Sequence, residues 1–297
     1  MAADAGPASL VRRRAWAKVN LSLHVVGRRP DGFHELDSLI VFAGIGDGLT
    51  AAPADDLTLT VDGPYAAALD ESGDAAENLV LRAARSLRAR AGATAGADLR
   101  LTKSLPVAAG LGGGSSDAAA ALRALVELWR LSVPEAELSD IAADLGADVP
   151  VCLAGRPSVV GGIGERIDPA PALPPAWLVL VNPGVPLATA VVFGAREGPF
   201  SGPARWAEPL ADASALARRL AGCRNDLEPA ARRLAPEIGE VLTLLTGTEG
   251  CLLARLSGSG ATCFGLYAEQ AGATRAAAAI RAVRPHWWVH AAPILDA

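Results

Sequence analysis

The feature that most restricts the fold of this chain is a glycine-rich segment between a predicted strand and a predicted helix. It reads P-V-A-A-G-L-G-G-G-S-S, from Pro106 to Ser116, and four of the five residues from 110 to 114 are glycine. Glycine has no Cβ and tolerates positive φ, so the backbone can turn sharply and approach a ligand closely. A helix beginning near Ser115–Asp117 adds unpaired N–H groups and a partial positive charge. Together these features predict a binding site for an anion such as a polyphosphate.

This loop matches neither of two common nucleotide-binding fingerprints. No Gly-Lys-Ser/Thr sequence closes it, as in a Walker A loop, and the G-x-G-x-x-G spacing of a dinucleotide fold is absent. The alternative interpretation is a flexible glycine loop in which serine caps the helix. Ser115 and Ser116 could cap that helix, bind phosphate oxygens or reach a metal ion.

Patterns of apolar residues predict a mixed α+β fold. Alternation predicts a strand at 15–26, a turn at Arg29–Gly32 and a returning strand at about 34–43. Further strands are expected at 57–61, 98–105, 177–181, 251–267 and 287–292, and helices at 79–91, 117–130, 134–145, 209–221, 226–246 and 270–283. Because strands and helices mix without strict βαβ alternation, both halves are expected to be α+β.

A proline-rich stretch divides the chain into two predicted domains. Residues 168–175 read D-P-A-P-A-L-P-P and are interpreted as the connection. The expected parts are a disordered tail at 1–12, an N-terminal domain at 13–168 and a C-terminal domain at 176–297. The length of 297 residues allows two ordinary domains, and the 51% hydrophobic content allows a sizeable core.

Charge and cysteine usage exclude several functions. The formal net charge of −5 argues against a protein that binds nucleic acid through a positive surface. The four cysteines show no C-x-x-C spacing, which disfavours a zinc site or a disulfide framework. No segment approaches the roughly 20 apolar residues of a membrane helix. A cytoplasmic protein without nucleic-acid or membrane partners is therefore expected.

Three polar residues outside the loop could carry chemistry. Lys18 lies on the strand face opposite the apolar row, where it could neutralise charge on a phosphoryl group, and Asn20 projects to the same side. Asp148 precedes Val149-Pro150, and proline is expected to hold Val149 extended and stiffen the loop. A carboxylate held there could act as a general base. The alternatives are an exposed strand lysine and a solvated turn aspartate.

Several motifs in order give the chain a family resemblance. They are A-K-V-N-L at 17–21, R-P-D-G-F-H-E-L at 29–36, E-N-L at 77–79, the loop to Asp117, L-G-A-D-V-P at 145–150, N-D-L-E at 225–228 and L-S-G-S-G-A-T at 256–262. The chain resembles the GHMP kinase superfamily, which includes galactokinase, homoserine, mevalonate and phosphomevalonate kinases. The motifs run from residue 15 to at least 265, so the resemblance covers most of the chain.

The resemblance implies a fold, a reaction and cofactors. The expected fold is two-domain, with an N-terminal ribosomal-protein-like ATP-binding domain and a C-terminal ferredoxin-like α/β sandwich domain. The most similar branch phosphorylates the 2-hydroxyl of 4-diphosphocytidyl-2-C-methyl-D-erythritol in non-mevalonate isoprenoid biosynthesis. ATP and Mg²⁺ are therefore expected, with no metal ligand assigned. The expected partner is a small molecule with a cytidine diphosphate group, and the expected state is a monomer or homodimer.

The resemblance also implies roles for individual residues. Lys18 and Asp148 match the catalytic pair. The positions expected to bind ATP are Asn78, Lys103, Pro106, Val107, Ala108, Ala109, Gly110, Leu111, Gly112, Gly113, Gly114, Ser115 and Ser116. The positions expected to line the substrate pocket are Asn20, Phe33, His34, Thr189 and Phe193.

Aromatic residues of the expected substrate pocket suggest how it would bind a cytosine. Phe33 and Phe193 could sandwich the base, since aromatic faces stack on bases, and His34 could hydrogen-bond to its edge. Many relatives have Tyr at the position of Phe33, so stacking is kept here whereas a hydroxyl is missing. The late loop 257–262 is placed beside the nucleotide phosphates by the resemblance, and its alternative is a simple hairpin turn.

Three other functions compete with this one. Another superfamily kinase, for homoserine or mevalonate, would lack the cytosine-reading pattern at 29–36. A non-catalytic nucleotide-binding or sensor protein would not need both Lys18 and Asp148. An RNA-binding module is disfavoured by the net charge of −5.

Overall fold

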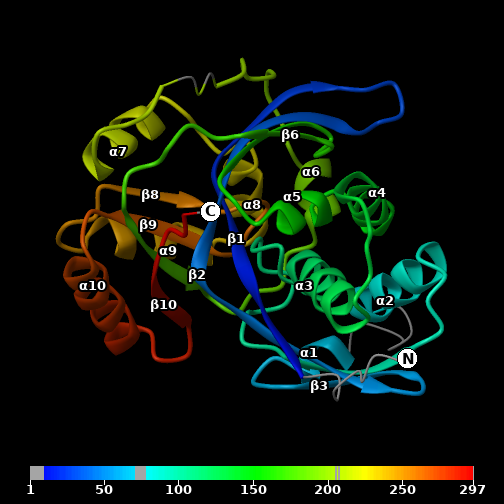
Figure 1. The fold of residues 1–297 in the computed structure, drawn as a ribbon. Helices are drawn as coiled ribbons and strands as arrows, with labels where there is room; N and C mark the ends of the chain where they lie inside the picture. The colour runs from blue at the N-terminus through cyan, green and yellow to red at the C-terminus, as the bar shows by residue number, and fades with distance from the viewer. Residues whose placement is uncertain (1–9, 71–77, 205, 207, 297) are drawn as a thin grey trace. The chain divides into compact units, whose positions relative to one another are not determined.

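The computed structural model describes residues 10–70, 78–204, 206 and 208–296 (Figure 1). The chain divides into two compact units that interleave along the sequence. The first unit contains residues up to 16, 46–107 and 113–154, and the second contains 17–45, 108–112 and 155–297. Strands β1 (Val11–Arg28) and β2 (His34–Ala54) each contribute residues to both units. Their 18 and 21 residues far exceed the usual strand length.

The interleaved units are a different kind of division from the domains expected from the sequence. The domain ranges 13–168 and 176–297 stay a prediction. The predicted tail is corrected at its end, because Val11 and Arg12 already lie in β1. Residues 1–9 of that tail lie outside the described residues.

In the first unit, helices cover a sheet formed around β4 (Gly96–Thr102). The later part of β2 pairs antiparallel with β4, with Gly48 opposite Thr102, and β3 (Leu57–Asp62) runs parallel to β4. The helices of this unit are α1 (Ala67–Asp70), α2 (Leu79–Arg90), α3 (Gly113–Leu128), α4 (Glu135–Leu145) and α5 (Val149–Ala154).

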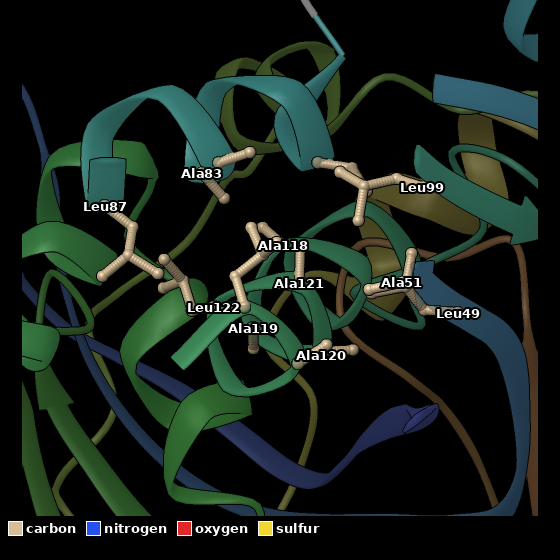
Figure 2. Packing of buried hydrophobic residues seen from close by; sticks show 14 of the residues in the cluster. Leu49, Ala51, Ala83, Leu87, Leu99, Ala118, Ala119, Ala120, Ala121 and Leu122 are labelled. Carbon is tan, nitrogen blue, oxygen red and sulfur yellow. The ribbon is translucent and has the colours of Figure 1, made fainter. Parts of the chain in front are cut away.

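Small side chains let α2 and α3 pack closely in the core of the first unit. Ala83 of α2 and Ala118 and Ala121 of α3 are fully buried. Figure 2 shows Leu122 of α3 turned toward Leu87 of α2 within the same cluster. This packing fixes α3, and therefore the end of the glycine loop from which α3 begins.

The second unit contains an antiparallel sheet in the order β10-β7-β9-β8. These strands are β7 (Trp177–Asn182), β8 (Leu253–Leu256), β9 (Cys263–Tyr267) and β10 (Trp288–Pro293). The earlier part of β2 pairs with β5 (Ser158–Gly162), which pairs with β6 (Arg166–Pro169). The helices are α6 (Thr189–Gly194), α7 (Ala213–Ala221), α8 (Glu228–Leu234), α9 (Glu237–Thr246) and α10 (Gln270–Val283).

Most predicted elements are present, with three corrections. The single helix expected at 226–246 is two helices, because the chain breaks at Ala235-Pro236, and proline cannot donate the hydrogen bond needed to continue a helix. Helix α3 begins at Gly113, four residues earlier than expected. The strand expected at 34–43 continues to Ala54.

A further correction concerns the two faces of β1. Only one face was expected in a core, yet polar residues of the other face are buried as well, with Lys18 and Asn20 exposing 5% and 3% of their surface.

Among the described residues, no helix is both long enough and apolar enough to cross a membrane. The structure describes all four cysteines, and none of them forms a disulfide.

Candidate active site

In the second unit, the glycine loop is held against the late loop 257–262. The Thr262 N–H donates to Ala109 O at 3.1 Å, and the Ser257 hydroxyl donates to Gly110 O at 2.9 Å. The late loop is itself closed by a bond from Ser257 N to Thr262 O at 2.9 Å. The two glycine-rich segments, about 150 residues apart in the sequence, therefore form one supported backbone structure.

Gly110 is required at the contact between these loops. Its φ is +74°, and a Cβ at this position would lie 2.4 Å from Ser257 O and 2.8 Å from Gly260 N. Both neighbours are backbone atoms that cannot rotate away, and positive φ strains any residue with a side chain. The sequence predicted close backbone approach here, and the structure shows that the approach is to another loop of the protein.

Lys18 and Asn20 lie beside this paired loop. Lys18 N donates to Leu111 O at 2.9 Å, and Lys18 Nζ donates to Asn20 Oδ1 at 3.4 Å. Asn20 in turn donates from Nδ2 to Ser38 Oγ at 2.8 Å and from its backbone to Ser257 Oγ at 3.2 Å. The alternative of an exposed strand lysine is wrong, because Lys18 is buried and oriented toward the loop.

In the first unit, two residues expected to bind ATP have structural partners. Ser116 Oγ donates to Trp16 O at 2.8 Å, which fixes the hydroxyl within the first unit. Asn78 caps α2, since its Oδ1 accepts from Val80 N at 2.9 Å. Ser115 is half-buried at the first turn of α3. Their roles toward ATP stay predictions.

Lys103 lies in a buried cluster with two carboxylates. Its Nζ donates to Asp117 Oδ2 at 2.7 Å and forms an ion pair with Asp47 Oδ2. Asp47 Oδ1 also accepts from Ser104 N at 2.5 Å and from Leu105 N at 2.8 Å. Only 3% of the Lys103 side chain is exposed. The predicted ATP-binding lysine is therefore engaged by protein groups on two sides.

The cluster contains one more negative charge than positive charge when all three groups ionise. Burial by itself lowers the pKa of Lys103, but the charges of Asp117 and Asp47 outweigh it and raise that pKa above its usual value. Burial, with a smaller contribution from Asp47, raises the pKa of Asp117 to about 7. Among the described residues, Asp117 Oδ1 has no hydrogen-bond partner. Asp117 is therefore the member that takes up a proton near neutral pH.

Asp148 lies directly before the short helix α5, which corrects the local geometry expected there. Val149 is the first residue of α5 rather than an extended residue, and Pro150 occupies the first turn, where its missing N–H costs nothing. The Cys152 N–H donates to Asp148 O at 3.2 Å. Asp148 is half-buried in a turn, so its role as a general base and the alternative of a solvated turn aspartate both stay predictions.

The expected substrate residues form a partial cluster in the second unit. The rings of His34 and Phe193 are stacked, with centroids 5.2 Å apart and planes 24° apart. Phe33 is 60% exposed, and its stacking on a base stays a prediction. Thr189 Oγ1 and Ser259 Oγ are 2.9 Å apart, which connects α6 to the late loop. Burial, with the charges of Arg28 and Arg196, lowers the pKa of His34, which favours the neutral form of its ring.

Sequence reasoning missed the roles of Asp47, Asp117 and Ser38. Asp47 lies between two glycines in a strand, and Asp117 directly follows the serine pair. An acidic residue flanked by Gly46 and Gly48 in an apolar strand was the available signal, because an unpaired buried carboxylate is costly and needs a partner. The partner, Lys103, is 56 residues further along the chain, so its identity required the structure.

Comparisons with known proteins identify the family of the chain. Residues 78–156 match the model of the GHMP kinases N-terminal domain, and residues 207–286 match that of the GHMP kinases C-terminal domain. A crystal structure of homoserine kinase from Cytophaga hutchinsonii shares the fold, with a TM-score of 0.70 at 19% identity over 97% of this chain and 95% of that one. Fold and motifs together define a GHMP-type small-molecule kinase.

More similar relatives narrow the class. A 4-diphosphocytidyl-2-C-methyl-D-erythritol kinase of Paramagnetospirillum magneticum is 57% identical over 94% of this chain and 97% of its own. One of Rhodospirillum rubrum is 53% identical over 96% of this chain and 92% of its own. A crystal structure of such a kinase has a TM-score of 0.78 at 37% identity, covering 96% of this chain and all of that one. The chain belongs to the 4-diphosphocytidyl-2-C-methyl-D-erythritol kinase family.

Proposed function

We propose that this protein transfers the γ-phosphoryl group of ATP to the 2-hydroxyl of 4-diphosphocytidyl-2-C-methyl-D-erythritol, yielding the 2-phosphate and ADP. The step belongs to non-mevalonate isoprenoid precursor biosynthesis. The observation that carries the proposal is the contact of Lys18 with the glycine loop, where its N–H lies 2.9 Å from Leu111 O. That contact holds a cationic side chain beside a backbone suited to phosphate, in a chain whose relatives are kinases for this alcohol.

Phosphoryl transfer requires positioning and charge stabilisation more than covalent chemistry. Asp148 accepts the proton of the substrate hydroxyl while that oxygen forms a bond to the γ-phosphorus. The bond from phosphorus to the β,γ-bridging oxygen breaks, and its electron pair leaves with ADP. Lys18 stabilises the negative charge on the transferring group, and Asn20 Oδ1 orients the Lys18 ammonium through their 3.4 Å contact.

Mg²⁺ fits the oxygen donors of the loop region. The described residues contain no group of three or more His, Cys, Asp or Glu side chains that could hold a metal alone. Mg²⁺ commonly needs only one or two protein oxygens beside nucleotide phosphates, and it neutralises phosphate charge when bound. The Ser115 hydroxyl would supply such an oxygen. Ser116 is less suited, because its hydroxyl already donates to Trp16 O.

The cytosine would bind near the stacked pair of His34 and Phe193. A neutral histidine can donate from one ring nitrogen and accept at the other, which suits the donor and acceptor edge of cytosine. Phe33 would cover the base with its exposed ring. A cytoplasmic location and a monomeric or homodimeric state complete the proposal.

A substrate panel tests the reaction. Purified protein is incubated with Mg-ATP and, separately, the cytidyl-erythritol compound, homoserine or mevalonate, and ADP release is measured. Turnover is expected with the cytidyl compound and not with homoserine or mevalonate. Preferred turnover of homoserine or mevalonate would contradict the proposed substrate.

Asp148→Asn tests the general base. The amide keeps the side-chain shape but cannot accept the hydroxyl proton, so kcat is expected to fall about 10²- to 10⁴-fold. Asp140→Asn, at an exposed position of α4, is the control and should keep normal turnover. Near-normal turnover of the Asp148 variant would remove it from this role.

Phe33→Ala tests the cytosine site. Loss of base stacking is worth about 1–3 kcal/mol, so the KM for the cytidyl substrate should rise roughly 5- to 150-fold while the KM for ATP is unchanged. Phe200→Ala is the control, because Phe200 is similarly exposed, at 51%, and lies outside the predicted site. A change in the KM for ATP alone would place the base elsewhere.

A further inference from the structure

We infer that Asp47, Lys103 and Asp117 form a buried ionic clamp that positions the phosphate loop, and that Lys103 acts through this clamp rather than by touching the nucleotide. The inference rests on the proposed role of residues 106–116 in binding ATP phosphates. All three residues of the clamp belong to the first unit. They are positioning residues, because their polar contacts are with one another and with backbone groups.

The clamp connects the segments on both sides of the loop. Asp47 Oδ1 accepts from Ser104 N at 2.5 Å and Leu105 N at 2.8 Å, which fixes the chain just before Pro106. Lys103 Nζ reaches Asp117 Oδ2 at 2.7 Å, which fixes the first turns of α3 just after Ser116. Asp47 also contacts Lys103, so a continuous set of polar contacts joins residues 103–105 to residue 117.

The first residue of α3 lies over this cluster. A Cβ placed on Gly113 would be 3.4 Å from Lys103 Nζ and 3.8 Å from Asp47 Oδ2. The backbone amides that begin α3 are those expected to face phosphate. Displacement of the cluster would therefore move these amides, and errors of about 1 Å in positioning can cost as much as 10²-fold in rate.

Burial explains why Lys103 is suited to this task and poorly suited to direct contact with ATP. Its relative exposure is 2%, and its backbone is also fixed, because Lys103 N donates to Asp62 O at 2.8 Å. A cation that left two buried carboxylates for a phosphate would leave both uncompensated, which is strongly unfavourable. The geometry therefore keeps Lys103 with its carboxylates.

The test separates loop positioning from global stability. Asp117→Ala removes one contact of the clamp, whereas Asp117→Asn keeps an oxygen that can accept from Lys103. Both are compared with Glu127→Gln, a control on the surface of the same helix. Lys103→Met is not informative, because direct contact and the clamp both predict weaker ATP binding. The readouts are the Kd for a non-hydrolysable ATP analogue, measured by calorimetry well below Tm, and amide exchange at 104–117 without nucleotide.

Asp117→Ala is expected to raise the Kd about 10-fold or more and to speed exchange at 104–117 while exchange in α2 stays unchanged. Asp117→Asn and Glu127→Gln should stay within about threefold of the wild type. If the alanine variant does not fold, Asp117→Ser replaces it, since its shorter side chain loses the Lys103 contact but remains polar. A lower Tm with normal Kd and normal loop exchange would overturn the inference. Wild-type protein that binds the analogue but does not phosphorylate the cytidyl compound would refute only the proposed substrate.

Discussion

The two parts of the glycine loop are held by different forces. Residues 108–112, in the second unit, are held by neutral hydrogen bonds to the late loop, such as Thr262 N to Ala109 O at 3.1 Å. The residues on either side of that part, in the first unit, are held by buried charges around Lys103. The first arrangement depends on steric fit and the second on ionisation.

This difference predicts different sensitivities. Neutral backbone hydrogen bonds do not titrate between pH 5 and 8. Substitutions that add side-chain volume should therefore disturb the 108–112 part strongly, whereas a change of pH should affect it little. The ionic part contains Asp117, whose pKa is raised to about 7 by burial, so it should respond to pH and charge.

Gly110→Ala should have the largest effect. The new Cβ would meet Ser257 O and Gly260 N at 2.4 and 2.8 Å, and the backbone would be strained at φ +74°. Separation of the two loops should lower kcat/KM by on the order of 10²-fold or more. Steady-state kinetics with varied ATP measures the loss.

Gly250→Ala is the matched control. Gly250 has φ +79° in the same unit, but nothing lies within 4 Å of its Cβ position. It should show only the backbone strain of about 1 kcal/mol as a lower Tm, with normal kinetics. Equal kinetic losses in both variants would mean that strain, rather than contact with the late loop, explains the requirement for glycine at 110.

Ser257→Ala should have the next largest effect. Its buried hydroxyl donates to Gly110 O and accepts from Asn20 N, so its removal leaves two polar groups of the site without this partner. The expected cost is about 2–3 kcal/mol, seen as weaker ATP binding that is independent of pH between 6 and 8. Ser158→Ala, which loses one bond to Arg156 O, is the control and should leave ATP binding normal. A strong pH dependence in the Ser257 variant would contradict the neutral character of this contact.

Asp117→Asn should reveal the ionic part through pH. The folded-state pKa of Asp117 is raised from 3.8 to about 7, so the folded protein keeps a proton that the unfolded chain loses. This contribution to stability is present below about pH 4 and is lost as pH rises toward 7. Asparagine cannot ionise. The free energy of unfolding of the variant should therefore rise by about 1–3 kcal/mol relative to that of the wild type as the pH increases from 5 to 8, measured by denaturant unfolding. A constant difference over that range would show that Asp117 has an ordinary pKa.

Asp144→Ala should have the smallest effect. Its carboxylate pairs with Arg90 at 2.8 Å, but the two side chains are 66% and 44% exposed. Water and salt screen such a pair, so its loss should cost about 0–1 kcal/mol in unfolding measurements. A cost similar to that of breaking the Lys103 cluster would mean that burial does not set the strength of the ionic part.

The sequence predicted elements whose pattern is local. Helix α10 was expected at 270–283 and lies at Gln270–Val283, because the apolar spacing that predicts it lies within the helix itself. The glycine loop was predicted from its composition and its place between a strand and a helix, and motif order then added the family roles of Lys18 and Asp148. The helix break at Pro236 was missed, although proline at that position was a readable signal.

What the sequence could not predict depends on distant partners. Alternation in β1 correctly placed Lys18 and Asn20 on one face, but it could not tell that this face is buried as well. Similarly, Lys103 was assigned to the nucleotide by resemblance, whereas its carboxylate partners come from a strand and a helix elsewhere in the sequence. Burial of a polar face depends on tertiary packing, which period-2 alternation does not encode.

The length of β1 constrains how this family can change. Trp16, whose carbonyl fixes Ser116, and Lys18, whose N–H fixes Leu111, are only two positions apart on that strand. Inserting or deleting one residue between them would turn every following side chain to the opposite side, exchanging Lys18 and Asn20 for apolar neighbours. Evolution can therefore replace side chains along this stretch one at a time, but it cannot lengthen or shorten the stretch without losing the ammonium group from the site.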